Sequence, residues 1–145
     1  MIIIVYSSFQ NKKYKEQEGY LQSEKISIHN EKVTDLDTHE LASIFATPSK
    51  HTDVQRENKI NEINTKVVVW NVIVYEVKRP RKFSYEIQTS WSEKMSATFL
   101  YINAQNEEDI NKIERLITGD NIRIKGRIEG VFLRFIIIRD VIILN

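Results

Sequence analysis

The stretch Lys66-Val-Val-Val-Trp-Asn-Val-Ile-Val-Tyr-Glu-Val77 decides the fold class of this chain. Most of its residues are β-branched or aromatic, which favours an extended strand over a helix. Apolar side chains fall on both alternating faces, as expected of a long strand that is buried on one face at each end of a curved barrel. The sequence therefore predicts a β-barrel in the residues that follow position 65.

The chain beyond residue 77 carries four more strands and one helix. Alternation of apolar and polar residues marks the strands. Asn106–Ile117 is the predicted helix, because Asn106 can cap it, acidic residues occupy its first turn, and Gly119 can end it from a left-handed position. The predicted strands cover residues 83–89, 97–102, 122–128 and 132–144.

One proline, Pro80, and one glycine, Gly126, predict local changes in the strand geometry. Lys78–Lys82 is predicted to form a turn, since Pro80 cannot continue a central ladder and four like charges need solvent. Gly126 falls in the core row of its strand, where it marks a bend or bulge that lets the strand curl across the barrel.

Two helix starts precede the first strand. Asp37-Thr-His-Glu40 has the pattern of a capping box and begins a short helix that Pro48 ends. Thr52-Asp-Val-Gln55 repeats the pattern and begins a second helix through about residue 63. The barrel is thus expected to carry a short helical N-terminal extension.

The predicted order is strand, strand, strand, helix, strand, strand, which is the arrangement of the five-stranded Greek-key barrel called the OB-fold. The fold class is mainly β with α, with the helix between strands 3 and 4. The segment Leu116-Ile-Thr-Gly-Asp-Asn-Ile-Arg-Ile-Lys-Gly-Arg-Ile128 resembles the helix end, Gly-Asp and basic strand of bacterial OB-fold domains. Together with Thr52–Arg56 and Lys66–Val68, it makes residues 38–144 resemble the tRNA-anticodon-binding-like group of small bacterial OB proteins. That resemblance implies nucleic-acid binding and export, although the chain has no lipoprotein cysteine.

The composition excludes several kinds of chemistry but does not identify a binding partner. The 145 residues contain 21 Lys and Arg against 20 Asp and Glu, so the net charge of +1 creates no field that would attract nucleic acid to the whole molecule. The absence of cysteine excludes thiolate catalysis, cysteine-bound zinc and disulfides. No stretch approaches the roughly 20 apolar residues of a membrane-spanning helix.

The N-terminal third is more polar than the predicted barrel and lacks a clear helical or strand period. We expect residues 1–36 to form a loosely structured arm and residues 37–145 to form the OB-fold domain with its helices. Met1–Tyr6 is either a short strand or the remnant of an export signal whose start lies upstream. The location of the protein is therefore left open, cytoplasmic by default and exported in the second case.

The surface that OB domains usually use combines strands 2 and 3 with the loops between strands 1 and 2 and between strands 4 and 5. Cations and aromatic rings predicted there suit single-stranded nucleic acid, because cations neutralise phosphates and rings stack on bases. A second candidate surface is the basic row on strand 4. The candidate residues are Lys78, Arg79, Arg81, Lys82, Tyr85, Trp91, Phe99, Tyr101, Arg123, Lys125 and Arg127.

Most of these residues also have a purely structural interpretation. The basic turn can be a solvated loop that discourages edge pairing. Phe99 and Tyr101 share one face, which either fills the barrel or stacks on a ligand. Arg123, Lys125 and Arg127 can pair across strands with acidic residues such as Glu129. The discriminating observation is whether the cations and the aromatic rings border one groove.

Catalysis and cofactors have little support in the sequence. The three histidines His29, His39 and His51 do not have metal-ligand spacing, and no glycine-rich phosphate loop or nucleophile elbow is present. We expect no enzyme, no metal and no cofactor. Three functions stay open: binding of single-stranded nucleic acid, binding of a protein or peptide by an envelope-associated barrel, and oligomerisation through Met1–Tyr6 adding to a sheet edge.

Overall fold

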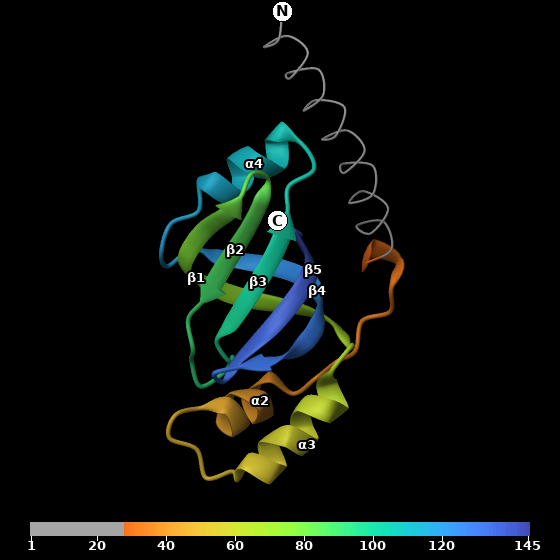
Figure 1. Cartoon of the computed structure of the whole chain (residues 1–145), viewed down its shortest axis with the longest axis vertical. Helices are drawn as coiled ribbons and strands as arrows, with labels where there is room; N and C mark the ends of the chain where they lie inside the picture. Colours follow the sequence, from red (N-terminus) through yellow and green to blue (C-terminus); the bar gives the residue numbers. More distant parts are fainter. Residues whose placement is uncertain (1–27) are drawn as a thin grey trace, which may run out of the picture.

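The structure, a computed structural model, describes residues 28–145, in which five strands close into a barrel (Figure 1). The order around the barrel is β1-β2-β3-β5-β4. All neighbours are antiparallel except β3 and β5, which are parallel. This is the OB-like topology that the sequence predicted. The strands are β1 (Val67–Arg81), β2 (Ser84–Thr89), β3 (Thr98–Asn103), β4 (Asn121–Phe132) and β5 (Phe135–Ile143).

Helices lie at both ends of the barrel (Figure 1). The helix α4 (Glu107–Glu114) connects β3 to β4, whereas α2 (Thr38–Phe45) and α3 (Asp53–Ile63) precede β1 at the opposite end. The predicted N-cap residues of α2 and α3 are confirmed, since Asp37 accepts a hydrogen bond from the Glu40 amide and Thr52 forms a capping box with Gln55. The box predicted at Asp37 is only half formed, because the Glu40 side chain pairs with Lys59 at 2.8 Å. Among residues 28–145, no helix is long and apolar enough to cross a membrane.

The core follows the alternation of the strands. Every second residue of β2 and β3 is buried inside the barrel, including Ile87 and Leu100. The end with α2 and α3 belongs to the same core, because Leu41, Phe45 and Ile63 pack in one apolar cluster with the barrel. Burial of these side chains supplies the main free energy of folding.

The turn predicted at Lys78–Lys82 begins later than expected. Strand β1 continues to Arg81, and the turn consists of Lys82 and Phe83. The pairing of β1 with β2 changes register between Lys78 and Arg81. Pro80 lies within that irregularity, where its missing N–H removes no ladder hydrogen bond. The basic residues are thus on the end of a β-hairpin.

Two other predicted boundaries differ. Helix α4 ends at Glu114, and Gly119, with φ of 98°, instead lies in the turn before β4, where its amide donates to the Val74 carbonyl at 2.8 Å. Phe132 ends β4 and does not begin β5, because Leu133 and Arg134 form a two-residue turn with positive φ at both positions. The bond that holds Gly119 is tertiary, so the local pattern did not indicate it.

The role predicted for Gly126 is confirmed. The pairing of β4 with β5 changes register between Lys125 and Arg127. A Cβ atom at position 126 would lie 2.5 Å from Cγ2 of Ile138 and 2.9 Å from Cγ2 of Val141. Only glycine allows β4 to approach β5 this closely.

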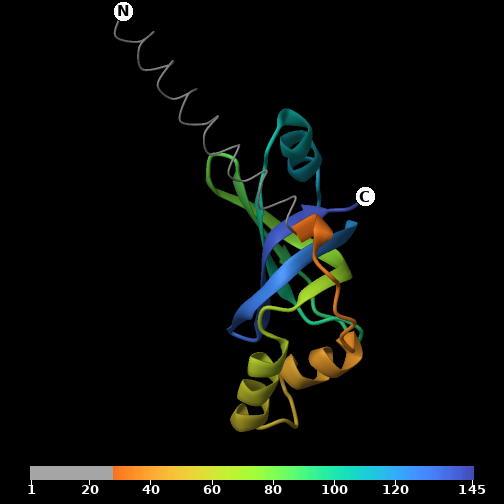
Figure 2. The same ribbon diagram turned by 90° about the vertical axis from the view of Figure 1, so that its right-hand side faces the viewer.

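Residues 28–36 lie along the outside of β4 and the start of β1 (Figure 2). Ile28 is fully buried against Val67 and Ile142, and the Thr34 amide donates to the Val67 carbonyl at 2.8 Å. We call residues 28–36 the N-terminal strap. The expectations for Met1–Tyr6 and for the rest of 1–27 fall outside the described residues.

Candidate functional site

The outer side of β2, β3 and β5 forms one continuous face. Residues opposite one another in a ladder project to the same side, so the register decides which side chains are neighbours. Gln88 lies opposite Phe99, and Phe99 lies opposite Ile137. We call this surface the aromatic face and define it by Glu86, Gln88, Phe99, Tyr101, Phe135, Ile137 and Arg139.

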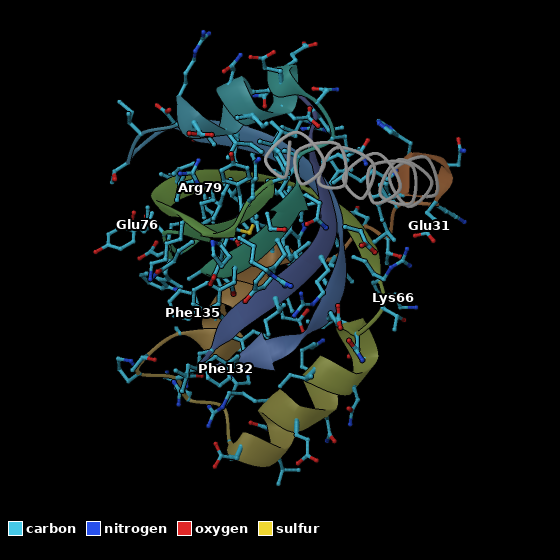
Figure 3. The ribbon with its side chains drawn as sticks, turned by 45° about the horizontal axis from the view of Figure 1, so that its top comes forward. Glu31, Lys66, Glu76, Arg79, Phe132 and Phe135 are labelled. Carbon is cyan, nitrogen blue, oxygen red and sulfur yellow. The ribbon has the colours of Figure 1, made fainter. Side chains whose placement is uncertain are left out.

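Two half-buried phenylalanine rings stack at the end of the aromatic face nearer α2. The ring centroids of Phe99 and Phe135 are 4.4 Å apart, with 20° between the ring planes. The exposed Phe132 lies opposite Phe135 across the β4–β5 hairpin. Figure 3 shows Phe132 and Phe135 together on one side of the barrel, away from Lys66 and Glu31. The pair presents an apolar surface on which a planar group can stack.

A cation covers the next ring on the same face. The guanidinium carbon of Arg139 lies 4.3 Å from the centroid of the Tyr101 ring. Nε of Arg139 also lies 2.8 Å from Oε2 of Glu129, which holds the side chain in place. A guanidinium held flat on an aromatic ring is itself a planar surface for stacking.

The β1–β2 hairpin brings its cations to two different sides. Lys78 lies opposite Glu86 and Arg81 opposite Ser84, so both belong to the side of the aromatic face. Arg79 lies on the other side, with Nη1 3.6 Å from Oε1 of Glu114 in α4. Within the described part of the chain, neither Lys78 nor Arg81 has an ion-pair partner.

Lys82 lies at the tip of the same hairpin. Its ammonium nitrogen is 5.0 Å from the centroid of the Phe83 ring. The hairpin therefore extends the aromatic face with a positively charged margin formed by Lys78 and Arg81, with Lys82 at the tip and Arg79 turned towards α4.

Tyr85 is not part of this surface, because its side chain is buried beneath α4. Its hydroxyl donates to Oε2 of Glu114 at 2.6 Å. Burial, and then the hydrogen bond to Glu114, raise the pKa of the Tyr85 phenol above its ordinary value. The contact ties α4 to the barrel, and Tyr85 has no free ring face for a ligand.

Trp91 is 51% exposed and contacts α2, which lies at the end of the barrel opposite α4 (Figure 1). Its Nε1 donates to the Ala42 carbonyl of α2 at 3.4 Å. The cations of the hairpin and Trp91 thus do not border one groove. Phe99 and Tyr101, by contrast, share a face with Lys78 and Arg81.

The basic row of β4 is largely engaged by the N-terminal strap. Lys125 is only 8% exposed, and its Nζ donates to the carbonyls of His29 and Glu31, each at 2.9 Å. Arg127 pairs with Glu31 at 2.7 Å, and that hydrogen bond is the largest cause that raises the pKa of its guanidinium. Only Arg123 of this row is exposed without an ion pair in the described residues.

The residues that sequence reasoning missed come from β5. Phe135, Ile137 and Arg139 alternate with buried residues, and this period of two was readable in the sequence. Their place beside β3 was not readable, because the β3–β5 pairing is parallel and joins distant segments. Within residues 28–145, no cluster of three or more His, Asp or Glu side chains could hold a metal ion.

A similar solved structure supports the fold. The chain is similar to a protein of Klebsiella pneumoniae described as a "putative nucleic acid-binding lipoprotein", with a TM-score of 0.52, 10% identity, and coverage of 78% of this chain and 92% of that one. It is also similar to OBody AM3L09 bound to hen egg-white lysozyme, with a TM-score of 0.45, 17% identity, and coverage of 62% and 92%. No protein-family model and no curated protein matches the sequence. The protein is thus an OB-like barrel.

Proposed function

We propose that this protein is a non-enzymatic binding module that takes single-stranded nucleic acid across its aromatic face. The observation that carries the proposal is the row formed by the Phe99–Phe135 stack and the Tyr101–Arg139 pair, bordered by Lys78 and Arg81. Aromatic rings beside unpaired cations are the combination that single strands require. The likeness to the Klebsiella protein supports the fold alone.

Each part of the aromatic face has a distinct task in this proposal. A base stacked on the Phe99–Phe135 pair or on the Tyr101–Arg139 pair gains roughly 1–3 kcal/mol. Lys78, Arg81 and Lys82 contact the phosphates that follow. Glu86 and Gln88 lie between the rings and the hairpin, where they can hydrogen-bond base edges. Such a surface supports the further proposal that the chain belongs to the tRNA-anticodon-binding-like group.

The test measures binding of a labelled oligothymidylate and its RNA counterpart, about twelve nucleotides long, by fluorescence anisotropy over a salt series. Phe99→Leu removes the stacking ring but keeps an apolar side chain, so we expect binding about tenfold weaker. Lys78→Ala with Arg81→Ala should lower the slope of log K against log salt by about 1.4, since each phosphate contact contributes roughly 0.7.

The matched control removes two exposed charges elsewhere, through Lys50→Ala and Lys66→Ala. Lys66 lies on the other side of the molecule from Phe135 (Figure 3). This control should bind as the natural chain does. An equal loss in both double variants, or no binding at low salt, would contradict the proposal.

A protein- or peptide-binding barrel is the second candidate, and the exposed tip of the β4–β5 hairpin favours it. Phe132 and Leu133 are both exposed there, beside the Phe99–Phe135 stack. Aromatic residues that form a continuous exposed patch are typical of protein interfaces. A partner protein that binds after nuclease treatment, and is lost with Leu133→Ser while oligonucleotide binding is unchanged, would support this second function.

A further inference from the structure

One strand of the barrel has a free edge. The pairing of β1 with β4 ends at Ile73 opposite Asn121, yet β1 continues to Arg81. Over this continuation, and within residues 28–145, β1 pairs only with β2. In this part of the chain the other edge of residues 75–81 has no neighbouring strand, and such an edge presents backbone groups to which another strand can bond.

The backbone groups along this edge are bonded to side chains and turns. The Tyr75 carbonyl accepts from the Thr118 hydroxyl at 2.7 Å. The Val77 amide donates to Oε1 of Glu76, the residue before it, at 3.2 Å. A contact of an amide with its own neighbour is a weak substitute for a ladder hydrogen bond, so an added strand can displace it.

A groove of about 500 Å³ runs beside this edge. Residues 74–79 of β1 form one wall, and Glu114 and residues 116–118, after α4, form the other. Tyr75 is 53% exposed and Ile117 is 68% exposed, one on each wall. The groove thus offers apolar contacts to a segment that lies along the free edge.

Charge restricts what can occupy the groove. Of the two carboxylates in its lining, Glu114 pairs with Arg79 and accepts from Tyr85, whereas Glu76, within the described chain, accepts only from the Val77 amide and keeps its charge. Lys78 has no ion pair in residues 28–145, and Arg81 follows on the same strand. Glu76, Lys78 and Arg81 together therefore leave a small net positive charge along the edge. Pairing of two copies would bring two edges of net positive charge together, which favours an acidic peptide over a second copy as the occupant.

From this geometry we propose that an extended peptide segment with alternating aliphatic and acidic residues adds to the free edge of β1 at Glu76–Arg79. Main-chain hydrogen bonds to β1 supply the affinity, and the side chains supply the selectivity. Aliphatic side chains of the peptide contact Tyr75 and Ile117, and its carboxylates pair with Lys78 and Arg81. This site shares Lys78 and Arg81 with the margin of the aromatic face but uses none of its aromatic rings.

The experiment titrates the full chain with a ten-residue probe peptide of alternating valine and glutamate, about the length of an edge strand. Binding is followed by anisotropy, and amide hydrogen exchange locates the contact. The amides of Val77 and Arg79 should become protected. A control peptide with every second backbone amide N-methylated keeps all side chains but loses ladder donors, so its affinity should fall about tenfold or more.

Two variants complete the test. Ile117→Ser changes an exposed side chain and should weaken the probe peptide severalfold without affecting stability. Phe99→Leu should leave the probe peptide unaffected. Equal binding of the N-methylated peptide, or protection confined to the aromatic face, would overturn the proposal, as would failure of the unmodified probe to bind.

Discussion

At the residue scale, the clearest lesson concerns Tyr85. The sequence predicted Tyr85 as a ligand-binding residue, but the structure places it in the core with its hydroxyl on Glu114. The phenol has a pKa above its ordinary value of 10.0, because burial and the carboxylate both disfavour its anion. The folded state therefore holds the proton more tightly than the unfolded chain.

The sign of the resulting pH dependence follows from that difference. Because the folded pKa is raised, the contribution is fully present below about pH 10 and is lost as pH rises further. We expect Tyr85→Phe to lower the free energy of unfolding at pH 8 by about 1 kcal/mol. The difference from the natural chain should shrink as pH rises to about 11.

Urea unfolding at both pH values measures this effect. Tyr75→Phe is the control. Tyr75 is half exposed, so loss of its hydroxyl should leave the free energy of unfolding unchanged at both pH values. A difference between Tyr85→Phe and the natural chain that stays constant up to pH 11 would refute the assignment.

At the element scale, the N-terminal strap explains the role of the basic residues on β4. Three alternating cations on one strand resembled a ligand surface, but Lys125 and Arg127 hold residues 28–36 against the barrel. The Lys125 ammonium donates hydrogen bonds to two backbone carbonyls, which allows its charge to be buried. A ladder of basic residues can thus be an attachment site for the chain itself.

Replacing Lys125 with methionine tests that interpretation. Lys125→Met keeps the apolar stem but removes both hydrogen bonds, so we expect a loss of about 1–3 kcal/mol of stability. The Thr34 amide, bonded to the Val67 carbonyl, should exchange its hydrogen at least tenfold faster. Arg123→Met, on the same strand but exposed, is the control and should change neither quantity. Loss of oligonucleotide affinity in Lys125→Met without faster exchange at Thr34 would instead make Lys125 a ligand contact.

At the scale of the whole molecule, the helices and the barrel share one core. Leu41 and Phe45 of α2 and Ile63 of α3 lie in the same apolar cluster as Val68 and Ile124 of the barrel. Elements that share a core in a chain of this length normally unfold together. This arrangement positions α2 beside Trp91 and the β4–β5 hairpin, at the end opposite the basic residues.

We therefore expect a single unfolding transition. Helical circular dichroism and tryptophan fluorescence should give the same midpoint in urea, because α2 and α3 cannot leave without exposing the core around Trp70. The control is the exposed-residue variant Val54→Ser in α3, which should leave the two midpoints coincident. If the helical signal disappears at a lower urea concentration than the change in tryptophan fluorescence, residues 37–145 consist of two units that unfold separately.

The sequence by itself determined the number and order of the strands, the capped helices and the need for glycine at position 126, because these depend on short-range periodicity and backbone sterics. Only the tertiary structure decided which outward side chains share a face. Phe99 meets Phe135 through a parallel pairing of distant strands, and Lys125 donates to carbonyls that lie 96 and 94 positions away in the sequence. Such contacts depend on closing the barrel, and a local pattern carries no information about which segment will lie alongside it.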